Sequence, residues 1–130
     1  MPFERLVFWS GVWNVGLGLS LVSPPITSLF GVRTPNPFWP WLDAGFLWYA
    51  SETLIASSRD VRGFASIVNY EALLRFFPVG MLIIHGVTYI GATPAALFAA
   101  TDFAWGVVYV VGLRRLTGRT HASLLLGRDR

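Results

Sequence analysis

Long apolar stretches, separated by short groups of polar and charged residues, divide the chain into four candidate helices. The first covers residues 3–22 and ends at Ser23-Pro24-Pro25, because proline cannot continue the helical hydrogen bonds. The others are predicted over residues 40–58, 67–90 and 95–113. Each segment is about as long as the hydrocarbon core of a bilayer is thick, so each is a candidate membrane span.

Turn signals separate these segments. A connection rich in proline follows the first helix, with a short turn predicted at residues 26–30, and Pro40 suits the first turn of the second helix. Gly91-Ala92-Thr93-Pro94 is typical of a helix end followed by a new helix start. The pattern predicts an all-α fold: one integral membrane domain, an antiparallel bundle of four transmembrane helices, with a basic cytoplasmic tail over residues 114–130.

Composition strengthens this prediction. Hydrophobic residues make up 54% of the chain and charged residues only 13%. Soluble domains carry about a quarter charged residues, and disordered chains carry still more charge and less apolar surface. The chain has no cysteine, which excludes disulfides, cysteine-ligated metals and thiol catalysis. It also lacks the phosphate-binding, dinucleotide and hydrolase motifs that would identify a reaction.

The ten basic residues are all arginine, and they lie between the apolar segments instead of forming one cationic face, which argues against a nucleic-acid partner. With four spans, one side of the membrane holds Arg5, Arg59, Arg62, Arg114, Arg115, Arg119, Arg128 and Arg130, and the other holds Arg33. The positive-inside rule then places both termini in the cytoplasm, as for a multi-pass protein of a bacterial inner membrane. Arg114, Arg115 and Arg119 are expected to meet lipid headgroups.

Polar residues within the spans are the candidate functional residues, because an ionisable group there costs about 2.5–3.5 kcal/mol on insertion scales. From their depth, Glu52 is predicted to pair with Arg75, and Glu71, one turn before Arg75, to share the guanidinium. A stripe of the second helix through Gly45, Tyr49, Glu52, Ala56 and Arg59 is expected to face a stripe of the third through Glu71, Arg75, Pro78, Leu82, His85 and Tyr89. One interpretation is an ion pair that holds two helices together; the alternative is a pair that handles protons or a ligand.

A second group is predicted nearer the outer side, where Asn14, His85 and Asp102 could converge with Asp43 around an outward-opening cavity. It could be a hydrogen-bonded packing cluster, a proton or small-ligand site, or a metal site, but one histidine is too few to predict a metal. Asp43 and Glu71 are also expected in the first turns of their helices, where the helix dipole favours carboxylates. Tyr49 and Trp105 complete the candidate set, and His121 is expected to be solvated in the basic tail.

Small residues predict where the helices approach each other, since lipid supplies no hydrophobic drive for helix association. Gly11, Asn14 and Gly18 share one face of the first helix. Ala95, Ala99, Asp102 and Gly106 share one face of the fourth. These faces could pack within the bundle or form a dimer contact.

The arrangement resembles the small four-helix bacterial inner-membrane proteins of the DoxX-like kind. The resemblance lies in Pro35-Asn36-Pro37 before a helix with Asp43-Ala44-Gly45 and Tyr49, in Arg59-Asp60-Val61-Arg62, and in Asp102-Phe103-Ala104-Trp105. Some members accompany quinone-linked oxidation, so the resemblance implies a membrane accessory role and carries over no catalytic residue.

The sequence therefore favours a non-enzymatic accessory subunit or hydrophobic-ligand-binding protein of a membrane complex, with lipids and another membrane protein or further copies as partners. The alternative is an oligomeric proton-coupled transporter or channel that uses the intramembrane acids. A membrane enzyme acting on lipid or quinone is a third hypothesis. No cofactor is identified, although a lipid or quinone-like ligand would fit this class.

Overall fold

The computed structural model describes residues 2–29, 36–85 and 92–127, and at residues 82, 85 and 92–95 it describes the backbone alone. Its elements are α1 (Phe3–Leu21), α2 (Pro24–Leu29), α3 (Phe38–Ser57), α4 (Ala65–His85), α6 (Ala92–Thr117) and α7 (His121–Leu126). The described part of the chain contains helices and no strand, so the all-α prediction is confirmed. The long helices α1, α3, α4 and α6 lie within a few residues of the four predicted segments.

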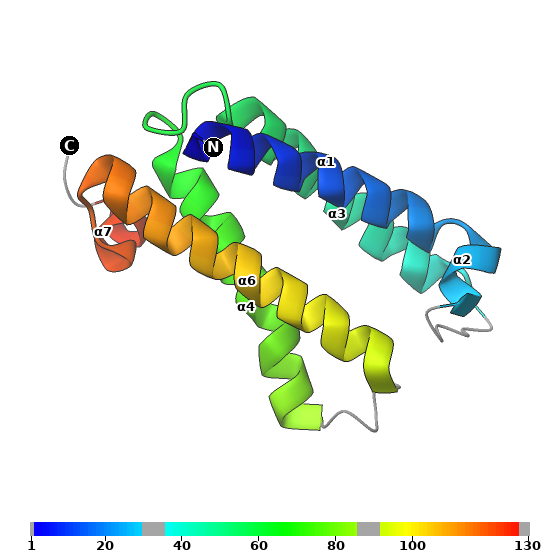
Figure 1. Cartoon of the computed structure of the whole chain (residues 1–130). Helices are drawn as coiled ribbons and strands as arrows, with labels where there is room; N and C mark the ends of the chain where they lie inside the picture. The colour runs from blue at the N-terminus through cyan, green and yellow to red at the C-terminus, as the bar shows by residue number, and fades with distance from the viewer. Residues whose placement is uncertain (1, 30–35, 86–91, 128–130) are drawn as a thin grey trace.

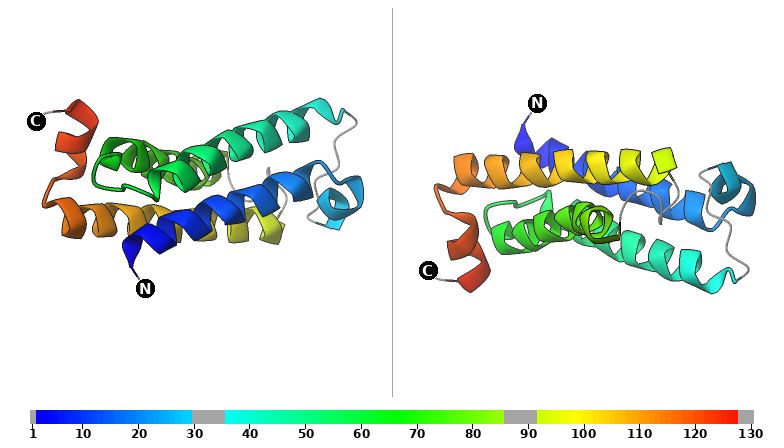
Figure 2. Two further views of the ribbon diagram at one scale, coloured as in Figure 1. Left: turned by 90° about the horizontal axis from the view of Figure 1, so that it is seen from above. Right: turned by 90° about the horizontal axis from the view of Figure 1, so that it is seen from below.

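The long helices form two antiparallel pairs (Figure 1). The most extensive contacts join α1 with α3 and α4 with α6, and smaller ones join α3 with α4 and α1 with α6. The pairs converge where α1 begins, where α3 turns into α4 and where α6 ends, and they diverge toward α2 and the end of α4 (Figures 1 and 2). Both chain termini and the turn after α3 therefore lie at one end of the bundle.

Small residues form the seams between paired helices. Gly11 of α1 lies so close to α3 that a Cβ atom on it would stand 2.8 Å from Ile55 Cγ1. Gly106 of α6 would meet the ring of Phe76 on α4 at 2.9 Å. Asn14 and Gly18 are also buried on the same face of α1, and Ala99 is 2% exposed on α6. The predicted seams on α1 and α6 are thus confirmed as packing within the chain; Ala95 lies outside the described side chains.

Large apolar side chains cover the outside of the bundle. Trp9 on α1, Phe46 on α3, Phe77 on α4 and Leu97 on α6 are between 55% and 65% exposed. Among the described residues, one helical segment, Ala96–Thr117, has the length and apolar character needed to cross a membrane, with a mean hydropathy of 1.7. Only 22% of its most apolar part is buried in the protein. A core helix of a soluble domain would be mostly buried.

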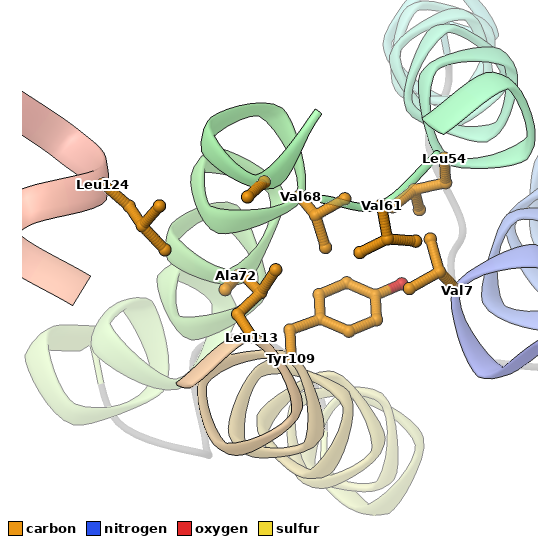
Figure 3. Packing of buried hydrophobic residues seen from close by; sticks show 9 residues of the cluster. Val7, Leu54, Val61, Val68, Ala72, Tyr109, Leu113 and Leu124 are labelled. Carbon is orange, nitrogen blue, oxygen red and sulfur yellow. The ribbon is translucent and has the colours of Figure 1, made fainter. Parts of the chain in front are cut away.

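A compact apolar core lies at the converging end of the bundle (Figure 3). Val7 of α1, Leu54 of α3, Val68 of α4 and Tyr109 of α6 are all fully buried there. Val61, in the turn between α3 and α4, is 1% exposed and completes the core. The turn itself is closed by Asp60, whose Oδ1 accepts a hydrogen bond from the Gly63 amide at 3.0 Å. This end of the bundle is therefore held by all four long helices.

The segment predicted as a basic tail is largely helical over its described residues, 114–127. Helix α6 continues to Thr117, and α7 then packs against α4 with Leu124 2% exposed. Ser66 and Tyr70 of α4 donate hydrogen bonds to the Leu124 and Leu125 carbonyls, each at 3.1 Å, so two carbonyls that a helix end leaves without partners are satisfied.

His121 is part of the same contact instead of being solvated. Its Nδ1 shares a hydrogen bond with Asn69 Oδ1, and Asn69 Nδ2 donates to the His121 carbonyl at 3.2 Å. Because an amide oxygen only accepts, Nδ1 carries the proton. His121 therefore fixes the start of α7 on α4.

Candidate functional site

A buried arginine, Arg75 of α4, is the centre of the polar interior. Its side chain is 5% exposed. Nη1 donates to Asp102 Oδ1 of α6 at 2.6 Å, and Nη2 donates to Asn14 Oδ1 of α1 at 2.8 Å. The guanidinium carbon also lies 6.0 Å from the ring centroid of Tyr109, within the range of a cation–π contact. One side chain thus joins three helices.

Tyr109 links this centre to the apolar core. The hydroxyls of Tyr109 and Ser10 share a hydrogen bond, and Ser10 Oγ donates its own proton to the Val7 carbonyl at 3.0 Å. Tyr109 is therefore the donor to Ser10. Both residues are fully buried, and Figure 3 shows the tyrosine ring reaching from α6 toward α1.

Glu71 brings the fourth helix into the cluster. It lies one turn before Arg75 on α4 and is 7% exposed. Thr53 Oγ1 of α3 donates to Glu71 Oε1 at 3.2 Å and also lies 2.9 Å from the Ala50 carbonyl. Within the described residues, every buried side-chain nitrogen and oxygen has a hydrogen-bond partner. The interior polar groups therefore form a satisfied network that holds α1, α3, α4 and α6.

The predicted Glu52–Arg75 pair is wrong, because Arg75 binds Asp102 and Glu52 is exposed. The whole predicted stripe of α3 turns outward, including Tyr49, which is 67% exposed. The buried face of α3 instead carries Ala44, Ser51 and Leu54. On the α4 stripe, Glu71 and Arg75 do face the interior.

The predicted outer group is divided by the structure. Asn14 and Asp102 do come together, but through Arg75 and not around a cavity with Asp43. Asp43 is exposed beyond the first turn of α3, and Glu71 lies well inside α4, so neither carboxylate is at a helix start. The side chain of His85 and residue Tyr89 lie outside what the structure describes. In the described part of the chain, no three acidic or histidine side chains gather as metal ligands.

Trp105 and the terminal arginines lie around the cluster. Trp105 is partly buried, with its ring centroid 6.2 Å from that of Tyr109. Arg114 and Arg115 are exposed on the last turn of α6, and Arg119 follows it with its amide hydrogen-bonded to Thr117 Oγ1 at 3.1 Å. These arginines lie at the converging end of the bundle, where a headgroup contact was predicted.

Three members of the network were not predicted: Ser10, Thr53 and Tyr109. Two of them carry a signal in the sequence. Ser10 is one turn before Asn14 on α1, and Tyr109 is two turns after Asp102 on α6, so each shares a face with a predicted residue. Thr53 carries none, because it is adjacent to Glu52, which has the stronger chemical character.

No protein-family model, curated protein or solved structure matches this chain. The resemblance to DoxX-like proteins therefore receives no support from a family match, and the functional argument depends on the chain's own geometry.

Proposed function

We propose that the chain is a four-span integral membrane protein that acts as a non-enzymatic accessory or hydrophobic-ligand-binding subunit, with both termini on the cytoplasmic side of a bacterial inner membrane. The proposal depends on one observation: polar side chains are buried inside the bundle, and large apolar side chains are exposed on its outside. The interior holds Ser10, Asn14, Glu71 and Arg75, whereas large apolar side chains are exposed on every long helix. Water-soluble proteins bury such side chains and expose charges.

The helix lengths agree with spanning. The long helices have from 19 to 26 residues, which corresponds to about 28–39 Å against a hydrocarbon core of about 30 Å. The average hydropathy of α1, α3 and α4 is reduced by polar residues. In α1 and α4, Asn14, Glu71 and Arg75 turn toward the interior network, so lipid would meet a more apolar surface on these two helices than the sequence average indicates.

The orientation follows from the arginines. Arg5, Arg59, Arg62 and Arg115 all lie at the converging end of the bundle, where the termini also lie (Figure 1). By the positive-inside rule this end is cytoplasmic.

Cysteine accessibility tests the membrane topology directly, because the chain has no cysteine of its own. Ser28→Cys on α2 should react with a membrane-impermeant maleimide from outside the inner membrane. Arg62→Cys, in the turn after α3, should react only after the membrane is opened. Phe46→Cys, on the apolar outside of α3, is the matched control and should stay unlabelled in both conditions.

Alkaline carbonate washing and purification complete the test. The wild-type chain should stay in membranes through the wash and should leave detergent columns with bound lipid or a second chain. Release by carbonate, or equal labelling of Ser28→Cys and Arg62→Cys from one side, would contradict the membrane topology. A stable monomer without lipid or partner would contradict the accessory and ligand-binding role.

Glu71 favours a second candidate, a proton-coupled transporter. Among the described side chains, the interior holds two carboxylates, Glu71 and Asp102, against one cation, Arg75, and Asp102 already takes a hydrogen bond from Arg75. Thr53 has one proton, so when that proton serves the Ala50 carbonyl, a protonated Glu71 is the group that donates to Thr53. Such a carboxyl could take up and release a proton.

Proton flux in liposomes separates the two candidates. For a transporter, Glu71→Gln should abolish pH-driven flux while leaving the folded fraction in detergent unchanged. Glu52→Gln, which neutralises an exposed carboxylate on α3, should leave the flux intact. Absence of flux in the wild-type protein would reject the transporter.

A further inference from the structure

An apolar groove of about 540 Å³ lies between the start of α1 and the second half of α6. Phe3 and Leu6 form its α1 side, and residues from Val107 to Leu116 form its α6 side. Gly112 lets the two helices meet there, since a Cβ atom at this position would collide with the Phe3 ring. The groove is separate from the buried network around Arg75.

The groove is apolar along its length and charged at one end. Its α6 wall runs over ten residues, from Val107 to Leu116, and is about 14 Å long, which is close to the depth of one leaflet, about half of a 30 Å hydrocarbon core. Arg115 is the one charged residue that lines it. Arg115 lies beside Leu116, at the end of the bundle where the chain termini lie, so the charge marks the groove's headgroup end.

Arg115 is available to a ligand. It is exposed and has no hydrogen-bond or ion-pair partner among the residues that the structure describes. Arg75, by contrast, is occupied by protein groups. A guanidinium at the mouth of an apolar groove complements a molecule that has a long apolar chain and an anionic head, and the guanidinium fork suits phosphate oxygens.

We propose that this groove binds one anionic phospholipid of the cytoplasmic leaflet, with an acyl chain between Phe3 and the α6 valines and the phosphate on Arg115. The inference deepens the proposed function and rests on it, because it requires the converging end to lie at the cytoplasmic headgroups. It names the ligand class of a hydrophobic-ligand-binding protein.

Native mass spectrometry tests the site with the full chain released from micelles that contain phosphatidylglycerol or phosphatidylcholine with identical acyl chains. The wild type should retain one phosphatidylglycerol in preference to phosphatidylcholine. Arg115→Gln should retain about fivefold less, which corresponds to the loss of about 1 kcal/mol for one arginine near the surface. Arg62→Gln removes a charge at the same end of the bundle that does not line the groove, and it should retain phosphatidylglycerol as the wild type does.

A groove-filling variant tests the acyl-chain contact. Val111 is 42% exposed and lines the groove, so Val111→Trp should displace both lipids without disturbing the core. Leu97→Trp, on an exposed part of α6 outside the groove, is the matched control and should retain them. Equal melting temperatures of the variants in detergent would show that folding is unchanged.

Three outcomes would overturn the inference. Equal losses in Arg115→Gln and Arg62→Gln would indicate a diffuse electrostatic attraction, and equal retention of the two lipids would remove the role of the headgroup charge. A change in the oligomer mass of Val111→Trp would indicate that a protein helix, and not a lipid, occupies the groove. If one of these outcomes is found while the protein resists the carbonate wash, the lipid site is rejected and the proposed function stands. If carbonate releases the protein, the proposed function is rejected as well.

Discussion

Two arginines along the contact between α1 and α6 have opposite environments. Arg75 is 5% exposed and is held by Asp102, Asn14 and the face of Tyr109. Arg115, at the end of the same contact, is exposed beside an apolar groove and has no ion-pair partner in the described part of the chain. The guanidinium of Arg75 is bound by groups of the protein itself, whereas that of Arg115 is available to a ligand.

The difference shows how a charge in an apolar setting acquires a role. A buried guanidinium is tolerated only when its hydrogen bonds are made, and once made they fix the helices that supply the partners. A guanidinium near headgroups loses little hydration, and its N–H donors remain available to another molecule. The interior should therefore respond to substitution through stability, and the groove through lipid retention.

Replacing Arg75 should have the largest effect. Arg75→Leu leaves Asp102 charged and Asn14 without its donor, and removal of one partner from a buried ion pair costs about 3–5 kcal/mol. The free energy of unfolding, measured in detergent micelles, should fall by that amount. Arg62→Leu, in the exposed turn after α3, is the control and should change it by less than about 0.5 kcal/mol.

A double variant separates charge burial from packing. In Arg75→Leu combined with Asp102→Leu no unpaired charge of this ion pair remains, so a substantial part of the lost stability should return. If Arg75→Leu is as stable as Arg62→Leu, the network does not hold the helices, and the contrast between the two arginines is lost.

The positions of the long helices along the chain could be predicted from the sequence because long apolar segments and proline signals act locally. The depth of a residue along its helix was less accessible: Asn14, Arg75 and Asp102 were all expected within the helices, but Arg75 was predicted to lie with Glu52 and not with the other two. The small seam residues Gly11 and Gly106 followed from the steric need for close approach.

The rotation of α3 could not be predicted in the same way. Adjacent helical residues point about 100° apart, so choosing Glu52 over Thr53 rotates by about 100° the face of α3 that is predicted to meet α4. The prediction followed the charge of Glu52, whereas the buried face of α3 carries Ala44, Ser51 and Leu54, and Ser51 lies against Gly11 of α1. The folding of α7 onto α4 could not be predicted either, since its six residues are too few to show a helical periodicity.

Among the interior substitutions, removal of the Tyr109 hydroxyl should lower the stability least. It therefore sharpens the contrast between a neutral hydrogen bond and a buried charge. Tyr109→Phe keeps the ring against Arg75 and Phe3 but removes the hydrogen bond to Ser10. Neutral interhelical hydrogen bonds in membranes average about 0.6 kcal/mol, far below the cost of an unpaired buried charge. The unfolding free energy in micelles should fall by about 0.6–1 kcal/mol.

A double-mutant cycle with Ser10→Ala assigns this loss to the bond itself. Because both single variants remove the same hydrogen bond, the double variant should be no less stable than the less stable of the two single variants. Additive losses would mean that the two hydroxyls act independently. A loss above about 3 kcal/mol in Tyr109→Phe would mean that the hydroxyl also positions Arg75, so the neutral and charged parts of the interior would form one cooperative unit.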